Sequence, residues 1–543
     1  MSTVAEVFAH TLKEIGVRYV FGVPSGNMID YVETLRKEEG IDFILVGHEA
    51  TAAFMAGVCG RFTGVPGVCF ATFGPGATNL STGVGGAQLD RFPLLAFTDE
   101  MPDEKLKRTV QMNINHQQLF FPITKWTTRL NQNNVEEIIL KGAGIATDDL
   151  RGAVHIGIPT GIGRNPVQKV KADVDYLRLE KKRWSPLVAD QIAKVEKLIQ
   201  KCKKPVLAVG LSAVHAQVSE QLIALAEKFQ LPVVLTPMAK GLFPESHSLY
   251  AGVLFHALSN QVAKVYSQAD LVIGIGYDPV EFNYEDWMPE VPLIHIDQQE
   301  ADVATGKIPE VVNVLGALEV ALNELLKLDV NPKAWDRQFL EANKQQIVNA
   351  LTPKPGSFGP LAVVDVLRKV LPDEGILTVD VGAHLHLVGQ QWRTPKPGKL
   401  LMTNGWSSMG FAIPAALAAK LCNPDLPVVA LMGDGGFLMM VGELATAKRL
   451  NLNIVFVVIY DNSLSLISIK QSKKQFDSGY GTDLNLLDQE PTNHYFGVPV
   501  VRVTNSDEYT KALEKAFTGD GPLVIEAVVD KEEYENLVLH PNK

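Results

Sequence analysis

Short apolar runs rich in β-branched residues alternate with helix-like patterns along the whole chain. In the first part of the chain, most of these runs are followed by a glycine-bearing turn or by apolar residues at helical spacing. A continuous apolar run of this length is typical of a strand that is buried on both faces of a parallel sheet. The runs of this first part lie at residues 17–24, 43–47, 67–74, 93–99 and 152–162.

Two further segments repeat this alternation, so we predict an α/β protein with three domains and mainly parallel sheets. Their apolar runs lie at residues 204–210, 232–237, 269–278 and 291–297, and then at 375–382, 427–436, 453–460, 498–503 and 522–529. A charged, weakly patterned stretch at residues 165–186 predicts a linker, and the Pro- and Gly-rich stretch at 351–360 predicts a second boundary. The predicted domains span residues 1–165, 187–330 and 358–543.

The composition is that of an ordinary globular protein of 543 residues, with 46% hydrophobic and 20% charged residues. The net charge of −11 argues against a nucleic-acid surface, which needs clustered Lys and Arg. No run approaches the roughly 18 apolar residues of a membrane span. We therefore expect neither nucleic acid nor a membrane as a partner.

The N-terminal residues and the cysteines predict a cytoplasmic protein. Residues 1–12 lack the basic region and apolar core of a signal peptide, and Thr3 with Glu6 instead gives the pattern of a helix capping box. The cysteines show no CxxC spacing, which predicts free thiols in a reducing compartment rather than disulfides or metal ligands. These cysteines are Cys59, Cys69, Cys202 and Cys422.

One acid, Asp434, stands between glycines at the point where a buried strand is predicted to end. A buried carboxylate is costly unless it has a partner. Ligands of open parallel sheets usually bind beyond the carboxyl ends of the strands, and the N-terminus of the following helix favours a phosphate there. Asp461 follows the strand predicted at 453–460, one helix and one strand later, so the two acids are expected at neighbouring strand ends.

Two acids beside a phosphate repel one another, and this predicts a cation between them. Mg²⁺ binds about six oxygens and commonly takes one or two carboxylates together with phosphate oxygens. The predicted protein ligands are the carboxylates of Asp434 and Asp461 and the backbone carbonyl of Ser463. Soft metals are not expected, because no Cys or His accompanies the acids. Taken alone, however, a Gly-Asp-Gly sequence is more often a simple turn.

The full stretch from Gly433 to Ser463 resembles the diphosphate-binding motif of thiamine-diphosphate enzymes. That motif has a GDG sequence, an acidic helix and a strand that commonly ends in Asn-Asn. Here the corresponding pair is Tyr460-Asp461, so the resemblance places Asp461 at a metal-ligand position that often holds Asn. If the register differs by one residue, Asn462 is the ligand instead.

The N-terminal segment resembles the same family. Glu49, in the stretch VGHEATAAFMAGVCGRFTG at residues 46–64, matches the family's catalytic glutamate. The alternative is an ordinary acid that stabilises a helix N-terminus through the helix dipole. The glycine-rich stretch at residues 72–100 is also close to the family pattern. Its glycines allow close approach of the backbone to the cofactor or a partner chain, or serve only as turns.

Within this family, the nearest resemblance is to the acetolactate synthase group, particularly its flavin-free catabolic branch. The matching stretches lie at residues 106–126, 275–287, 378–392 and 403–421. The resemblance implies a pyrimidine-binding domain, a central Rossmann-like domain and a diphosphate-binding domain, in that order. It also implies active sites between two chains, and hence a homodimer or homotetramer. We expect no FAD, mainly by likeness to this branch, and residues 274–282 lack the helix-opening third glycine of a dinucleotide motif.

The resemblance further implies the residues that bind thiamine diphosphate. Met409 matches the bulky residue that holds the cofactor in a folded V shape, and a core methionine is the alternative. His384 matches a phosphate contact, and a structural histidine is the alternative. The expected cofactor-binding residues are Gly382, Ala383, His384, Ser407, Met409, Gly433, Asp434, Gly435, Gly436, Asp461, Ser463, Leu464 and Leu466.

Two residues are expected to be catalytic. The resemblance implies that Glu49 hydrogen-bonds the pyrimidine of the cofactor and that Gln111 lies near the reacting carbon. His116 and Gln117 are weaker candidates, because they can equally cap or stabilise a helix.

The chemistry that the resemblance implies is the decarboxylation of a 2-oxo acid such as pyruvate, with Mg²⁺ and thiamine diphosphate. The intermediate is then joined to a second carbonyl compound, as in acetolactate synthases. The alternative is protonation to an aldehyde, as in a non-ligating decarboxylase or 2-hydroxyacyl lyase. A non-catalytic binding protein is disfavoured, because Glu49, Asp434 and the metal loop are all present.

The sequence departs from acetolactate synthases near the expected substrate site. The turn PSGNMID carries Asn27 and Met28 where the catabolic branch has a lysine, and residues 465–475 lack the Gln-Trp pair of the biosynthetic branch. Leu464, Leu466 and Ile467 predict an apolar acceptor pocket. The identities of donor and acceptor, and the choice between dimer and tetramer, stay open at this point.

Overall fold

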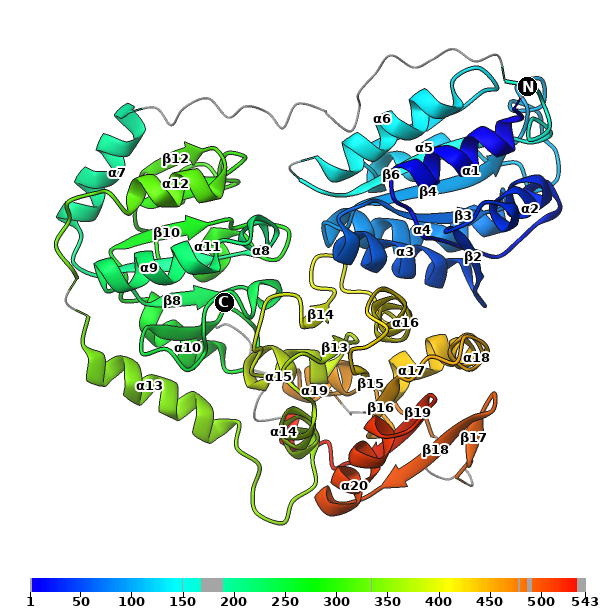
Figure 1. Cartoon of the computed structure of the whole chain (residues 1–543). Coiled ribbons are helices and arrows are strands. Elements are labelled where there is room, and N and C mark those ends of the chain that lie inside the picture. Colours follow the sequence, from blue (N-terminus) through cyan, green and yellow to red (C-terminus); the bar gives the residue numbers. More distant parts are fainter. Residues whose placement is uncertain are drawn as a thin grey trace.

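A computed structural model describes residues 2–148, 150–167, 189–333, 335–476, 479–485 and 491–534. It contains three sheets, each covered by helices, and they follow one another along the chain (Figure 1). The first lies in the blue and cyan part, the second in the green part, and the third in the yellow to red part. The predicted fold class, three α/β domains with mainly parallel sheets, is confirmed.

The first sheet has the strand order β2-β1-β3-β4-β6-β5, and every pair in it is parallel. The predicted capping box is present, since the Thr3 side chain accepts from the Glu6 N–H and the Glu6 carboxylate accepts from the Thr3 N–H. The strands are β1 (Tyr19–Gly22), β2 (Asp42–Leu45), β3 (Gly67–Ala71), β4 (Leu94–Glu100), β5 (Trp126–Arg129) and β6 (Ala153–Pro159). The α-helices are α1 (Val4–Glu14), α2 (Ile29–Lys37), α3 (Glu49–Thr63), α4 (Pro75–Leu89), α5 (His116–Phe120) and α6 (Val135–Thr147), with 3₁₀ turns η1 (Gly26–Met28) and η2 (Phe121–Ile123).

The second sheet is also parallel throughout, in the order β12-β11-β10-β7-β8-β9. Its strands are β7 (Pro205–Val209), β8 (Val233–Leu235), β9 (Tyr250–Val253), β10 (Leu271–Ile275), β11 (Leu293–Asp297) and β12 (Val311–Leu315). Its helices are α7 (Ala189–Lys201), α8 (Leu211–Ala216), α9 (Ser219–Phe229), α10 (Ser259–Tyr266), α11 (Tyr284–Trp287) and α12 (Leu318–Leu325), with the 3₁₀ turn η4 (Pro237–Ala239). Helix α13 (Arg337–Ala350) leads from this part to the third sheet.

The third sheet has the order β14-β13-β15-β16-β19-β18-β17, and only β17 runs antiparallel to its neighbour. Its strands are β13 (Ile376–Val379), β14 (Leu400–Met402), β15 (Val428–Gly433), β16 (Val455–Tyr460), β17 (His494–Tyr495), β18 (Val498–Val503) and β19 (Leu523–Val528). Its helices are α14 (Pro360–Val370), α15 (Ala383–Gln391), α16 (Ala412–Cys422), α17 (Asp434–Met440), α18 (Leu444–Arg449), α19 (Ser465–Lys473) and α20 (Ser506–Phe517), with the 3₁₀ turn η5 (Val441–Glu443).

Most of the predicted linker at 165–186 lies outside the described residues. The Pro- and Gly-rich stretch at 351–360 falls between α13 and α14. The predicted ranges 1–165, 187–330 and 358–543 each contain one complete sheet, and they stay proposed domain limits.

Helix α17 begins at Asp434, directly after β15, and the chain continues through η5 and α18. The helix can begin at the first residue after the strand because the glycines at 435 and 436 let it pack closely against its neighbours.

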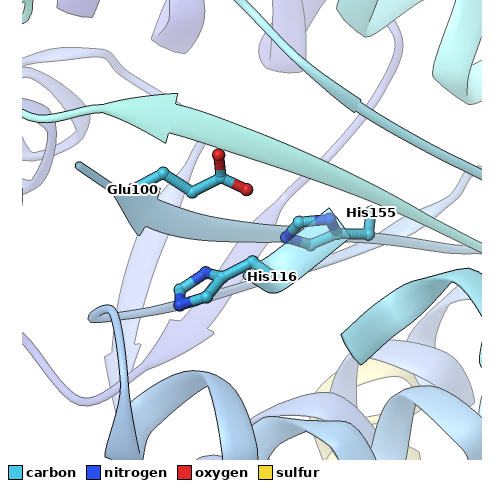
Figure 2. A group of neighbouring side chains, drawn as sticks. All are labelled: Glu100, His116 and His155. Atoms are coloured by element: carbon cyan, nitrogen blue, oxygen red, sulfur yellow. The ribbon is translucent and has the colours of Figure 1, made fainter. Parts of the chain in front are cut away.

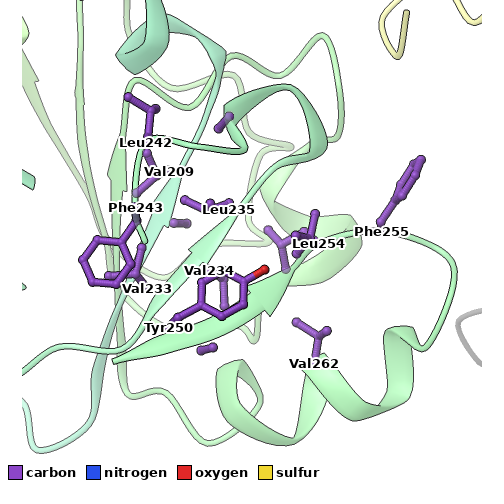
Figure 3. Packing of buried hydrophobic residues seen from close by; sticks show 14 of the residues in the cluster. Val209, Val233, Val234, Leu235, Leu242, Phe243, Tyr250, Leu254, Phe255 and Val262 are labelled. Atoms are coloured by element: carbon purple, nitrogen blue, oxygen red, sulfur yellow. The ribbon is translucent and has the colours of Figure 1, made fainter. Parts of the chain in front are cut away.

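The central strands are buried on both faces, as their continuous apolar runs predict. In the second sheet, the buried hydrophobic cluster includes Val209, Val233, Leu235, Phe243 and Leu254, and the ring of Phe243 lies beside Val233 (Figure 3). All five of these side chains are inaccessible to solvent.

The first and third parts of the chain share one hydrophobic cluster. Helix α3 packs against α16, and the rings of Phe54 and Phe411 meet edge to face at 5.8 Å. The Asp90 carboxylate accepts hydrogen bonds from the backbone N–H groups of Gly405 and Trp406 at 2.9 and 3.3 Å. These contacts fix the N-terminal sheet against the loop that precedes α16 in the same chain.

None of the helices in the described part of the chain combines the length and the apolar character that a membrane crossing requires.

Candidate active site

A cavity of about 220 Å³ lies beyond the carboxyl ends of β13, β15 and β16. The chain passes from β13 to β14 on one side and then returns to β15 on the other, so this is a switch point in the strand order, where parallel sheets usually bind ligands. Every residue that the sequence predicts to bind the cofactor lines this cavity. They are Gly382, Ala383, His384, Ser407, Met409, Gly433, Asp434, Gly435, Gly436, Asp461, Ser463, Leu464 and Leu466.

Asp434 is buried at the end of β15, where it is the first residue of α17. Its carboxylate accepts hydrogen bonds from the N–H groups of Gly435 at 2.8 Å and Asn462 at 2.6 Å. Burial, and then the nearby carboxylate of Asp461, raise the pKa of Asp434 to about 7. The backbone hydrogen bonds oppose this rise but do not cancel it, so the carboxylate lacks a full counter-charge.

Asp461 lies at the end of the neighbouring strand β16, as expected from its position in the sequence. Its carboxylate accepts from the Ser463 N–H at 3.1 Å and from the Ser465 hydroxyl at 2.6 Å. Burial raises the pKa of Asp461 to about 6. The cavity therefore holds two carboxylates whose ionised forms burial destabilises, and a divalent cation between them would stabilise both.

Three glycines of the cavity wall leave no room for a side chain. A Cβ at Gly382 would lie 2.6 Å from the His384 ring, and one at Gly436 would lie 2.9 Å from the Asp380 carboxyl group. A Cβ at Gly435 would lie 2.5 Å from Cδ2 of Leu464. The glycines therefore let the backbone of α15 and α17 line the cavity directly.

Within the described residues, two polar atoms at the cavity are buried without a hydrogen-bond partner, namely Nε2 of His384 and Oγ of Ser463. Burial lowers the pKa of His384 to about 4, so its imidazole is neutral at physiological pH and carries one N–H. Buried polar atoms normally have a hydrogen-bond partner. A phosphate group in the cavity would accept from the Ser463 hydroxyl, so this residue fits the diphosphate of the expected cofactor.

Met409 is half-buried and lines the cavity. This position suits a residue that contacts the cofactor better than a methionine that only fills the hydrophobic core. The loop of Met409 is held by Asp380, a fully buried residue that the sequence analysis did not identify. The Asp380 carboxylate accepts from the Val381 N–H at 2.7 Å and from the Gly410 N–H at 2.9 Å. Like Asp434, Asp380 is an acid at the end of an apolar run, and this signal was available in the sequence.

Tyr534 also lines the cavity and was not predicted there, because its segment carries no motif. Ile467, which was predicted to form an apolar acceptor pocket with Leu464 and Leu466, lines the cavity beside them. The remaining lining residues that were not predicted are Val381, Ile459 and Ser465.

Glu49 and Gln111 do not line this cavity within one chain. Glu49 is the first residue of α3, and its Oε2 accepts a hydrogen bond from Nδ2 of Asn79 at 2.9 Å. A Cβ at Gly76 would lie 3.3 Å from Oε1 of Glu49, so the N-terminal turn of α4 packs against this carboxylate. Gln111 is exposed in a turn whose next residue, Met112, contacts the backbone beside Gly74. Both predicted catalytic residues thus lie near the N-terminus of α4.

His116, one of the weaker candidates, belongs to a buried cluster with His155 and Glu100 (Figure 2). The Gly74 N–H donates to Nε2 of His116 at 3.2 Å, so Nδ1 carries the proton and donates to Oγ1 of Thr98 at 2.9 Å. The Thr98 hydroxyl then donates to Nε2 of His155 at 2.8 Å. Burial lowers the pKa of His116 to about 4, so the ring is neutral.

The chain of hydrogen bonds continues from His155 to Glu100. Nδ1 of His155 donates to the Thr127 hydroxyl at 2.8 Å, which donates to Oε1 of Gln117 at 2.8 Å. Nε2 of Gln117 donates to Glu100 at 2.6 Å, and Arg129 pairs with the other carboxylate oxygen at 2.7 Å. The four ring nitrogens of His116 and His155 and both carboxylate oxygens of Glu100 have partners among the described residues. The cluster therefore offers no free ligand atom to a metal. His116 holds Gly74 at the start of α4, and Gln117 links Glu100 to Thr127 and to the Thr128 carbonyl of β5, so both residues have structural contacts of the kind that the prediction gave as its alternative.

Family models match all three parts of the chain. Residues 2–119 match the thiamine pyrophosphate enzyme N-terminal TPP binding domain, residues 192–325 match the central domain, and residues 380–527 match the C-terminal TPP binding domain. The three α/β parts and these matches together define a thiamine pyrophosphate enzyme.

Similar proteins cover nearly the whole chain. An acetolactate synthase of Bacillus subtilis (strain 168) is 30% identical over 98% of this chain and 94% of its own length. A probable acetolactate synthase large subunit of Methanocaldococcus jannaschii is 30% identical over 97% of this chain and 92% of its own length. Acetolactate synthase isozyme 1 large subunit of Escherichia coli (strain K12) is 28% identical over 98% of this chain and 94% of its own length.

The chain therefore belongs to the thiamine pyrophosphate enzyme family, as an acetolactate synthase-like member. It is a thiamine-diphosphate-dependent enzyme of the decarboxylase and carboligase type, which confirms the resemblance seen in the sequence.

Proposed function

We propose that this enzyme uses Mg²⁺ and thiamine diphosphate to decarboxylate a 2-oxo acid and to join the resulting fragment to a second carbonyl compound. The observation that carries the proposal is a pair of acids at neighbouring strand ends, the buried Asp434 and the half-buried Asp461, in the cavity that all the expected cofactor-binding residues line. The names of the similar proteins support the carboligation step.

The diphosphate end of the cofactor is proposed to bind at α15, α17 and the loop after β16. Asp434, Asp461 and the Ser463 carbonyl would hold Mg²⁺, the hydroxyl of Ser463 would donate to a phosphate oxygen, and His384 would line the diphosphate site. The Asn462 N–H already donates to Asp434, whereas the carboxylate of Asp461 lines the cavity. This arrangement favours Asp461 over Asn462 as the metal ligand.

The active site is proposed to form between two chains. The cavity of about 220 Å³ is smaller than the roughly 300–1,000 Å³ usual for a ligand of this size, and Glu49 of the same chain does not line it. A second chain that placed its Glu49 over the open side would complete the pocket. We therefore propose a homodimer, or a homotetramer built from such dimers.

When bound, the cofactor supplies a nucleophilic carbon and an electron sink for decarboxylation. Glu49 is proposed to hydrogen-bond the pyrimidine ring and to hold a proton there, while Asn79 fixes the orientation of its carboxylate. Met409 would support the bend of the cofactor. Leu464 and Leu466 would keep water from the reacting carbon, which favours attack on a second carbonyl over protonation.

The substrate is proposed to be pyruvate or a close relative. Asn27, in the turn where the catabolic branch has a lysine, is exposed near the carboxyl end of β1 and offers an amide instead of a positive charge. An acceptor without a carboxylate would bind more readily beside Asn27 than a second pyruvate would, because it has no negative charge that needs a counter-ion.

The proposal is tested by incubating the protein with pyruvate, Mg²⁺ and thiamine diphosphate and identifying the products, alone and with a panel of aldehyde and 2-oxo acid acceptors. Formation of a hydroxyketone or of acetolactate supports a carboligase. Acetaldehyde as the sole product in every mixture would contradict carboligation and support the non-ligating alternative. An Asp434→Asn variant serves as the control and is expected to form no product.

A further inference from the structure

Two cysteines from different domains meet where α3 packs against α16. Cys59 lies near the C-terminal end of α3 and Cys422 is the last residue of α16, and their Sγ atoms are 3.1 Å apart. Both are free thiols. An S–S bond is about 2.05 Å long, so the two sulfurs need to approach by only about 1 Å to form one.

A small cavity opens beside the two thiols. It has a volume of about 50 Å³, and both cysteines line it together with Arg18 and Tyr19. One water occupies about 30 Å³ in the liquid, so a molecule of the size of hydrogen peroxide fits here. Cys422 is half-buried whereas Cys59 is buried, so an oxidant that enters the cavity reaches Cys422 more easily.

The surroundings make the two thiols unequal. A hydrogen bond from the Cys59 thiol to the ionised sulfur lowers the pKa of Cys422, and the guanidinium of Arg18 lowers it further. The same contact and burial raise the pKa of Cys59 well above its usual value. The thiolate is the reactive form of cysteine, so Cys422 is the nucleophile of the pair and Cys59 is placed to react second.

We propose that Cys59 and Cys422 are a peroxide-reactive dithiol that closes to a disulfide between the first and third domains of one chain. The Cys422 thiolate attacks one oxygen of hydrogen peroxide, the O–O bond breaks, and hydroxide leaves and takes up a proton as water. The Cys59 sulfur then attacks the sulfenic acid on Cys422, the S–O bond breaks, and the second water leaves with the Cys59 proton. Two thiols lose two electrons in total, and peroxide accepts them.

The disulfide would tie together two helices that begin at the proposed active-site segments. Helix α3 begins at Glu49, and α16 begins three residues after Met409. Because the two cysteines are 363 positions apart in the chain, the bond also closes a very long loop and restricts the unfolded state. The oxidised protein is therefore expected to unfold at a higher temperature than the reduced protein. Bond formation does not depend on the proposed function.

The test treats the complete protein with hydrogen peroxide, alkylates the remaining thiols under denaturing conditions and maps the peptides by mass spectrometry. Two of the four cysteines are expected to be lost to alkylation, and the Cys59 and Cys422 peptides to be recovered joined, with the chain remaining a monomer on a non-reducing denaturing gel. A reductant added afterwards restores all the thiols.

The Cys202→Ser variant is the matched control, because Cys202 is also partly exposed but its thiol donates to the Ile199 carbonyl instead of contacting a cysteine. It is expected to form the same bridge, whereas Cys422→Ser forms none. Recovery of all four thiols from the wild type, of a sulfenic acid without a bridge, or of a bridge between two chains would overturn the proposal. The wild-type peptide map decides the outcome even if a variant fails to fold.

Discussion

At the scale of single residues, Asp434 and Asp461 set the chemistry of the cavity. Asp434 is buried and Asp461 half-buried, and desolvation raises the pKa of Asp434 to about 7 and that of Asp461 to about 6. Neither has a basic side chain among its hydrogen-bond partners. Negative charge at this position is therefore a cost to the folded chain that a bound divalent cation would offset.

The raised pKa of Asp434 predicts how pH changes the stability of the protein without metal and cofactor. A carboxyl group whose folded pKa lies above its unfolded value of 3.8 favours folding at low pH, and this contribution is lost as the pH rises toward about 7. The Asp434→Asn variant, which cannot ionise there, is expected to match the wild type near pH 4 and to exceed it at pH 8. Thermal unfolding of stripped protein across this range measures the difference.

Adding Mg²⁺ with thiamine diphosphate at pH 8 is expected to raise the unfolding temperature of the wild type and to leave Asp434→Asn nearly unchanged. A difference between the two proteins that is the same at every pH would show that the carboxylate of Asp434 does not ionise in this range.

Glu49 carries the second prediction at this scale. Replacing it by Gln keeps the size of the side chain and a contact to Asn79 but removes the group that is proposed to hold a proton at the pyrimidine. Proton exchange at the thiazolium carbon is expected to slow by about 10²- to 10⁴-fold, the usual contribution of an acid–base group, with cofactor affinity near normal. Hydrogen–deuterium exchange of bound cofactor, followed by NMR after quenching, measures this rate.

The Glu14→Gln variant is the control, because Glu14 is an exposed acid at the end of α1. It is expected to leave the exchange rate unchanged. If Glu49→Gln exchanges the thiazolium proton at the wild-type rate, Glu49 does not have the proposed role.

At the scale of secondary-structure elements, the cavity depends on how closely α17 packs against the loop after β16. A Cβ at Gly435 would lie 2.5 Å from Leu464 and 3.3 Å from Cε of Met409, so Gly435→Ala must push these side chains into the cavity. We expect this variant to bind thiamine diphosphate at least about 10-fold more weakly, as is common when the shell around a site is disturbed. Calorimetric titration in the presence of Mg²⁺ measures the affinity.

Gly442→Ala is the matched control, because a Cβ at Gly442 in the neighbouring turn η5 would meet no heavy atom of the described residues within 4 Å. It is expected to bind the cofactor as the wild type does. Equal affinity of Gly435→Ala and wild type would mean that the cofactor does not occupy this cavity.

The elements also show what the sequence can and cannot predict. The central strands were predicted because they are buried on both faces and give continuous apolar runs. The strands that were not predicted, β5, β9, β12, β14 and β17, all lie at an edge of their sheet. They are short or alternate between buried and partly exposed residues, so no apolar run marks them.

The same reasoning applies to the cavity. Asp434 was identified because an acid among glycines at a strand end is unusual, and the resemblance to a family supplied the remaining predicted residues. Tyr534 was not identified, because tertiary packing alone brings it from a distant segment to the cavity wall. His116, by contrast, was a candidate in the sequence, but its hydrogen bonds with Thr98 and Gly74 account for its burial without a catalytic role.

At the scale of the whole molecule, the first and third domains of one chain are held together without forming a complete site. Helix α3 packs against α16, and the Glu443 carboxylate accepts from the N–H groups of Gly47 and His48 at 2.9 and 3.0 Å. The cavity at Asp434 nevertheless lacks Glu49 of the same chain. We propose that each active site combines Glu49 of one chain with Asp434 and Asp461 of another.

Mixing two inactive variants tests this claim most directly. Glu49→Gln and Asp434→Asn chains carrying different affinity tags are co-expressed, and the mixed oligomer is isolated and assayed for consumption of pyruvate. In a mixed dimer one site carries both defects while the other combines two intact halves, so we expect about half of the wild-type activity per mixed dimer. A mixed oligomer no more active than either variant alone would contradict a site shared between chains.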